Sequence, residues 1–414
     1  MFLDDMHMKT ELNLEMKKQQ ILDNLPLLVA VCITIISQVE GIPFQNIIRV
    51  GMYAIWVVVG LYYIAIKKAR VYSSDLCLFI PAFLTIGISL LLSVFVHNYR
   101  FPDDIMKIYG LATLLLMLGR IIARLRISLE EICLVLAVYV FMSVILALYI
   151  IMQVWSGISN WLGQVKYLYD SKNSASQILA SAVIILISVD QNQRLVFKFV
   201  RWVFICGLLF VILYIQARAT IIGLFVSFLS GFLLFSRYIR RQKMQLLLGL
   251  FLAFSIIIMT IPSACTVFSK IFRLNEGTGF SINEFTSSRL TKYREALQLW
   301  LSSPLFGIGD GYVDNFIINL LMNGGIMLLM LVGVPTYYIT SKAIYKHATC
   351  KIHQSRLSRP FVCLNIFFLT ISVFEAHAPL GPGACTFILW LLLGFMFEKG
   401  QIINRKVVRN SLAE

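Results

Sequence analysis

Long apolar segments dominate this chain and are separated by short polar connections. A helix that crosses a membrane needs about 20 mostly apolar residues, so each segment predicts a transmembrane α-helix. The even number of segments puts both termini on the same side. We therefore expect an all-α, polytopic bundle of about twelve transmembrane helices, forming one domain over residues 1–414. The segments are 22–39, 50–66, 76–96, 105–122, 130–152, 174–189, 202–216, 219–236, 244–262, 315–340, 361–376 and 384–397.

One polar segment, residues 263–313, is much longer than the other connections and joins the ninth and tenth predicted spans. Part of it has helical periodicity, and Pro304 is expected to end that helix. Arg289 lies at the helix start, close to the apolar stripe, where a cation opposes the helix dipole. An anionic group is therefore expected near Arg289, and the helix is expected along the outer membrane surface or over the mouth of the bundle. The predicted stripe consists of Leu290, Tyr293, Ala296, Leu297, Trp300 and Leu301.

Composition and charge agree with a membrane protein and fix an expected orientation. Hydrophobic residues make up 59% of the chain, charged residues 14%, and the formal net charge is +15. Of the 36 basic residues, about 25 fall in segments that lie inside if the N-terminus is cytoplasmic. The charge therefore indicates topology and not nucleic-acid binding, and both termini are expected in the cytoplasm. The eight cysteines lack metal-ligand spacing, so no metal site is expected.

Arg218 is the single charge within residues 202–236. One straight helix of 35 residues would be about 52 Å long, too long for a hydrocarbon core of about 30 Å. The segment should therefore turn near residues 216–220. An arginine there either reaches the outer headgroups or, because charge at membrane depth is costly, serves a function.

Other polar residues with possible functions lie at the predicted outer ends of spans. Lys172 and Asn173 precede the sixth span and could anchor and cap it, or bind substrate. Asp314 and Asn315 open the tenth span and could cap it, or act in chemistry. Glu375 and His377 lie at the outer end of the eleventh span and could be solvated, or act as base and orienting group. The sequence leaves each pair of alternatives open.

Together these motifs resemble the O-antigen ligase and Wzy-type polymerase superfamily. The resemblance rests on Gln-Ala-Arg-Ala at 216–219, Pro-Leu-Phe-Gly-Ile-Gly at 304–309, Asp-Asn-Phe at 314–316 with a later Gly-Gly-Ile, and Lys172-Asn173. It covers roughly residues 165–340. Many ligases of the superfamily have His-Asn where this chain has Asp-Asn, which favours similarity to capsule and exopolysaccharide polymerases.

The resemblance implies a metal-independent glycosyltransferase without cofactor, acting on undecaprenyl-pyrophosphate-linked oligosaccharides outside the bacterial plasma membrane. Expected partners are membrane lipids, a flippase and a chain-length regulator. Guanidinium groups suit a departing pyrophosphate because they bind it bidentately. The backbone N–H groups of the turn at 307–309 are expected to be free for phosphate. The expected catalytic residues are Arg218, Arg289 and Asp314, and the expected substrate-binding residues are Lys172, Asn173, Arg294, Asn315, Glu375 and His377.

Two other functions remain open at this point. A ligase of the same superfamily would transfer the chain to a different acceptor. A lipid-linked oligosaccharide flippase or another transporter would need cations along a path through the membrane. Lys107 and Arg120 are the two cations predicted near mid-span, and the outer loop is richer in polar groups.

Overall fold

The computed structural model describes ten stretches of the chain and five isolated positions between 245 and 269, and these residues contain helices and no strand. The stretches are 22–40, 44–95, 103–125, 127–154, 172–188, 195–235, 289–309, 311–349, 357–381 and 385–411. The first half contains a helix Leu22–Ile36, α2 (Gln45–Ala65), α3 (Ser73–Leu76), the 3-10 turn η1 (Cys77–Phe79), α4 (Ile80–Phe95), α5 (Asp103–Arg124), α6 (Leu129–Val154) and α7 (Lys172–Ser188). The second half contains α8 (Leu195–Tyr214), α9 (Arg218–Phe235), α13 (Arg289–Ser302), α14 (Phe316–Leu328), the π-helical turn η3 (Leu329–Gly333), α15 (Val334–Thr349), α16 (Ser358–Ile371) and α17 (Phe387–Ser411).

Seven of the described helices are long and apolar enough to cross a membrane, and three more are apolar but shorter. Their outer surface is also apolar: Leu195 and Phe199 of α8 are 85% and 70% exposed. Exposed apolar surface on this scale is typical of helices that face lipid. The predicted helical membrane bundle is thus supported, whereas the count of twelve is not established. The ninth predicted span, 244–262, and residues 263–288 of the long loop lie outside the described stretches, apart from the isolated positions.

Two close helix pairs form the interior of the bundle. Gly119 of α5 and Gly394 of α17 each face the backbone of the other helix so closely that a Cβ atom at either position would collide with it. Small residues allow this approach, as at many helix contacts within membranes. In the second pair, Ser227 of α9 donates a hydrogen bond of 2.7 Å to the carbonyl of Cys363 in α16. Close packing of small residues therefore brings sequence-distant helices together.

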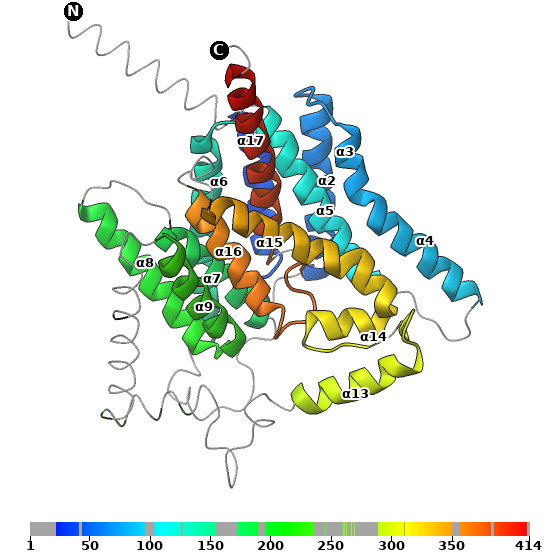
Figure 1. The fold of residues 1–414 in the computed structure, drawn as a ribbon. Coiled ribbons are helices and arrows are strands. Elements are labelled where there is room, and N and C mark those ends of the chain that lie inside the picture. The colour runs from blue at the N-terminus through cyan, green and yellow to red at the C-terminus, as the bar shows by residue number, and fades with distance from the viewer. Residues whose placement is uncertain are drawn as a thin grey trace, which may run out of the picture.

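The helices run alternately between two ends of the bundle (Figure 1). At one end, called the Arg289 end, α13 and α14 contact the turn after α16, and Lys172 at the start of α7 lies near Glu375 of the same turn. At the other, called the Arg120 end, α5 finishes beside α3 and α17 passes towards the C-terminus. The predicted turn between the seventh and eighth spans is confirmed, since α8 ends at Tyr214 and α9 begins at Arg218. Gln216 makes this turn without glycine by adopting φ 53°.

A buried ion-pair network stabilises the Arg120 end. Asp75 Oδ1 lies 2.9 Å from Arg120 Nη1, and Glu398 contacts Arg120 Nε and Arg124 Nε at 3.0 Å each. Arg124 also pairs with Asp75 and lies 4.5 Å from the ring centre of Tyr72. Two cations and two anions thus neutralise one another where α3, α5 and α17 meet. Arg120 lies four residues before the end of α5, away from the middle of this helix, and Glu398 of α17 is one of its counter-ions.

The tenth predicted span, 315–340, is not one regular helix. Phe316–Ala348 is 33 residues long, and Gly325 interrupts it with φ 61° and ψ −158°. Figure 1 shows α14 as a short helix at the Arg289 end, between α15 and α13. A glycine is needed here because a side chain would collide with the backbone of Leu305. The eleventh predicted span also differs, since α16 ends at Ile371 and Glu375 lies in the following turn.

Candidate active site at the Arg289 end

Arg289, the first residue of α13, is bound by two carboxylates from other elements. Its Nε donates to Asp314 Oδ2 at 3.1 Å, and its Nη2 lies 3.9 Å from Glu375 Oε1. Asp314 precedes α14, and Glu375 lies in the turn after α16. The expectation of an anionic group near Arg289 is therefore confirmed: these carboxylates offset the unfavourable position of a cation at a helix start.

Tyr293, one turn after Arg289, docks α13 onto the bundle. Its hydroxyl lies 2.5 Å from the carbonyl oxygen of Asp314 and 3.2 Å from that of Val373. Ala296 is buried on the same face, whereas Leu301 on the predicted apolar stripe is 64% exposed. The inward face of α13 is thus narrower than predicted, and the exposed leucines give the helix an apolar outer surface suited to a membrane interface.

The break in α14 joins this helix to the loop after α13. The N–H groups of Ile326 and Met327 donate to the carbonyls of Pro304 and Leu305 at 3.0 and 3.1 Å. Gly325 makes the approach possible because it has no side chain. The Pro-Leu-Phe-Gly-Ile-Gly and Gly-Gly-Ile motifs, 15 or more residues apart, therefore form one interlocked unit.

The backbone N–H groups of the glycine turn at 307–309 are hydrogen-bonded within the protein. The N–H of Gly307 donates to Ser303 O and that of Ile308 to Met322 O, both at 2.8 Å. Gly307 adopts φ 67°, and a Cβ atom there would lie 2.6 Å from Met322 O. The expectation that this turn offers free N–H groups to phosphate is wrong for both residues, because their hydrogen bonds go to the protein itself.

Asp314 and Asn315 have different roles. Asn315 is the N-cap of α14: its side-chain oxygen accepts from the N–H of Ile318 at 3.0 Å, and its Nδ2 donates to Val373 O at 3.1 Å. Asp314 does not cap the helix; its carboxylate binds Arg289. Of the alternatives left open by the sequence, capping is correct for Asn315 and wrong for Asp314.

Two further asparagines of α14 hold the site together and were not among the predicted residues. Asn319 accepts from the N–H of Val313 at 3.3 Å and donates to Ala376 O at 3.4 Å. Asn323 donates to Gly311 O at 3.1 Å and to Asn319. Both are buried. The three asparagines are spaced four residues apart, at 315, 319 and 323, so they lie on one helix face, a signal that the sequence contains.

Glu375 is the most strongly perturbed carboxyl of the site. It is only 8% exposed, and its Oε1 is buried without a hydrogen bond. Burial, reinforced by the charge of Asp314, raises the pKa of Glu375 to about 7, although Arg289 and Lys172 oppose this change. A carboxyl group in this condition can take up or release a proton near neutral pH.

Lys172 and Asn173 are the first two residues of α7, which begins two residues earlier than the predicted span, and the charge of Lys172 acts on Glu375. Ser176 donates to Asn173 O at 2.9 Å, and its hydroxyl lies 2.7 Å from that of Thr220 in α9. Arg218, the first residue of α9, therefore lies at the same end of the bundle as Lys172.

The remaining predicted residues lie around this group. The ring of His377 makes an edge contact with Tyr312, with centroids 5.8 Å apart. Arg294 has an exposed side chain on α13, and Arg289 alone on this helix has a described contact with the carboxylates. In the part of the chain that the structure describes, no group of three or more His, Cys, Asp or Glu side chains could hold a metal ion.

Comparison with protein-family models and with curated proteins gives no match to this sequence. The resemblance to the O-antigen ligase and polymerase superfamily therefore rests on its motifs alone. The functional assignment depends on the chemistry of the Arg289 end.

Proposed function

We propose that this chain is a polysaccharide polymerase of the bacterial plasma membrane, which joins polyprenyl-pyrophosphate-linked repeat units on the outer face. The observation that carries the proposal is Arg289 beside the buried Glu375, whose pKa is about 7. The distribution of basic residues supports an outward Arg289 end and cytoplasmic termini. The alternative functions are a ligase and a transporter, and the experiment below distinguishes both from a polymerase.

The cations at this end suit a pyrophosphate leaving group. Arg289 comes from α13, Lys172 from the start of α7 and Arg218 from the start of α9. In our proposal they bind the pyrophosphate at the headgroup boundary and stabilise the charge that develops as its bond to the sugar breaks. Asp314 positions Arg289 through its Nε, which directs the remaining guanidinium nitrogens.

Glu375 is proposed as the proton acceptor. The hydroxyl oxygen of the acceptor sugar attacks the anomeric carbon of the donor, and the bond from that carbon to the pyrophosphate oxygen breaks. The electron pair leaves with the pyrophosphate, and the hydroxyl proton passes to the Glu375 carboxylate. A base with a pKa near the working pH combines adequate ionisation with adequate basicity.

The test uses the purified protein in lipid vesicles with a lipid-linked repeat unit as the single substrate. We expect a ladder of lipid-linked chains together with release of polyprenyl pyrophosphate. Arg289→Gln should lower the rate about 100-fold or more, as for loss of a charge-stabilising donor. Lys292→Gln removes a charge from an exposed position of the same helix and should leave the rate unchanged.

The products distinguish the candidate functions. Elongation that requires a second, chemically different acceptor would identify a ligase. Movement of the lipid-linked sugar across the vesicle membrane, without release of polyprenyl pyrophosphate, would overturn the enzymatic proposal and favour a transporter.

A further inference from the structure

A second feature lies away from the Arg289 end, on the outer surface of the bundle. A groove of about 260 Å³ runs between α6 and α8, with Ile185 and Leu186 of α7 as its floor. Phe141 and Phe197 at its sides are 63% and 59% exposed, so the groove opens outward and not into the core. The other lining residues are Cys133, Leu136, Ala137, Val140, Val144, Val200, Arg201 and Phe204.

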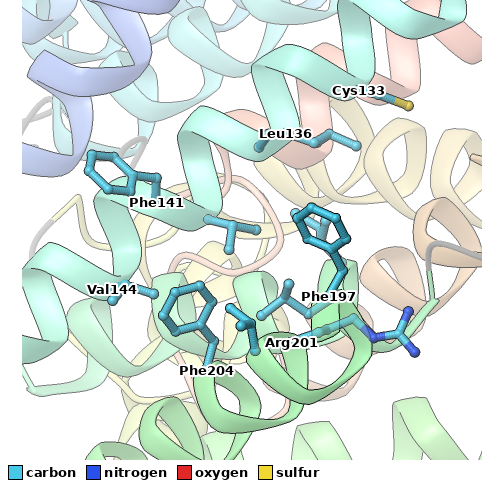
Figure 2. A pocket seen from close by; sticks show the side chains of 12 residues that line it. Cys133, Leu136, Phe141, Val144, Phe197, Arg201 and Phe204 are labelled. Atoms are coloured by element: carbon cyan, nitrogen blue, oxygen red, sulfur yellow. The ribbon is translucent and has the colours of Figure 1, made fainter. Parts of the chain in front are cut away.

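Arg201 gives this apolar groove a charged end. Its stem runs along the groove, and its guanidinium points away from Phe204 and Val144, beyond Phe197 (Figure 2). Long basic side chains commonly cover apolar surface with their stems while placing the charge near headgroups.

The position of the groove along the helices defines which membrane leaflet it faces. Residues 133–144 belong to the first part of α6, and residues 197–204 to the first half of α8. Both helices start at the Arg120 end. The groove therefore lies in the half of the bundle opposite the candidate active site, with its basic end nearest the headgroups of that leaflet.

We propose that this groove binds an anionic phospholipid from the leaflet at the Arg120 end. One acyl chain lies between α6 and α8 over the floor of α7, and the phosphate contacts Arg201. With the orientation proposed above, this is the cytoplasmic leaflet. The inference depends on the chain lying in a membrane but not on the chemistry of the Arg289 end.

Shape and charge both favour this occupant. Sites for drug-sized molecules usually have volumes of about 300–1,000 Å³, and this groove of about 260 Å³, lined along three helices by aliphatic and aromatic side chains, suits one acyl chain. Among the described lining residues, Arg201 is the single charged side chain, so a polar ligand would lose its hydration without compensation along the rest of the groove. A basic side chain near the membrane surface should favour an anionic over a zwitterionic headgroup about five-fold.

The experiment measures lipid retained by the whole protein after purification from nanodiscs containing equal amounts of phosphatidylglycerol and phosphatidylcholine. Native mass spectrometry should show one retained phosphatidylglycerol at about five-fold excess over phosphatidylcholine. Phosphatidylglycerol with a photoreactive acyl chain should crosslink to residues 133–144 and 197–204. Equal retention of both lipids, or crosslinks elsewhere, would overturn the proposal.

Two variants test the groove and its charge separately. Val140→Trp fills the groove and should abolish retention, whereas Val58→Trp, at a site 56% exposed on α2, should not. Arg201→Gln should reduce the preference for phosphatidylglycerol to about one-fold, whereas Arg359→Gln, exposed at the same end, should leave it unchanged. If Arg201→Gln still prefers phosphatidylglycerol over phosphatidylcholine, the lipid phosphate does not bind at Arg201. If Val140→Trp shows no cooperative thermal unfolding, the variant is not folded. The crosslinks of the parent protein to residues 133–144 and 197–204 then decide whether the lipid binds in the groove.

Discussion

Replacing Glu375 with glutamine should make the protein more stable at alkaline pH while removing its activity. The substitution keeps the size and most of the shape of the side chain but prevents ionisation. Glu375 is buried, and its nearest cation, Arg289, is 3.9 Å away and shared with Asp314. The structure thus indicates that the cost of burying the charge exceeds the gain from this ion pair.

The magnitude follows from the pKa. Raising the pKa of Glu375 from 4.5 to about 7 means that ionising it in the folded protein costs about 3 kcal/mol more than in the unfolded chain. Because the folded-state pKa is raised, the neutral Glu375 carboxyl contributes its full stability to the fold below about pH 4.5. That contribution is lost as the pH rises through about 7. Glu375→Gln avoids the loss, so it should be more stable than the parent by up to about 3 kcal/mol at pH 8.

The assay is unfolding of the detergent-solubilised protein at pH 5 and pH 8, combined with polymer formation in vesicles. The parent and Glu375→Gln should differ by less than about 1 kcal/mol at pH 5 and by up to about 3 kcal/mol at pH 8. Glu295→Gln, the same change at an exposed position on α13, should match the parent at both values. Polymer formation by the parent should decline as the pH falls below about 7, because the proposed base becomes protonated.

Two results would refute this reasoning. If Glu375→Gln is less stable than the parent at pH 8, the ionised carboxylate stabilises the fold and the argument from burial is wrong. If the variant polymerises at the parental rate, Glu375 is not the proton acceptor.

Three further predictions concern other parts of the chain. Arg218→Lys should form little polymer although the protein still inserts into the membrane, because an ammonium group cannot bind pyrophosphate bidentately as a guanidinium group does. Polymer of normal chain length would instead indicate that Arg218 only anchors the turn at the lipid headgroups. Gly325→Ala should cost about 2–4 kcal/mol of unfolding free energy, from its positive φ and the collision with the preceding loop, whereas Gly51→Ala has open space around its Cβ and should not destabilise α2. Glu398→Gln should cost about 3–5 kcal/mol in thermal or chemical unfolding, because it removes one of the two carboxylates that neutralise Arg120 and Arg124, and the exposed Glu130→Gln should be neutral.

The sequence by itself determined the local features of this protein. Runs of apolar residues predicted the helices, since the membrane requires each span to satisfy its own backbone hydrogen bonds. The turn before Arg218 followed from length alone, because a stretch of 35 residues with a single charge exceeds one crossing. The anionic neighbour of Arg289 followed from the helix dipole, a property that depends on position within one helix.

Tertiary structure decided which of these features meet. Glu375 is 61 residues beyond Asp314, and nothing in the local pattern shows that both contact Arg289. Likewise, only the packing of α14 against the loop at 304–309 shows that the N–H groups of Gly307 and Ile308 bind carbonyl groups of the protein and are not free for phosphate. Above all, the pKa of Glu375 depends on the loss of water around it and on three charges from other elements. Periodicity reports which residues face inward on one helix, but desolvation depends on what every neighbouring element places against that face.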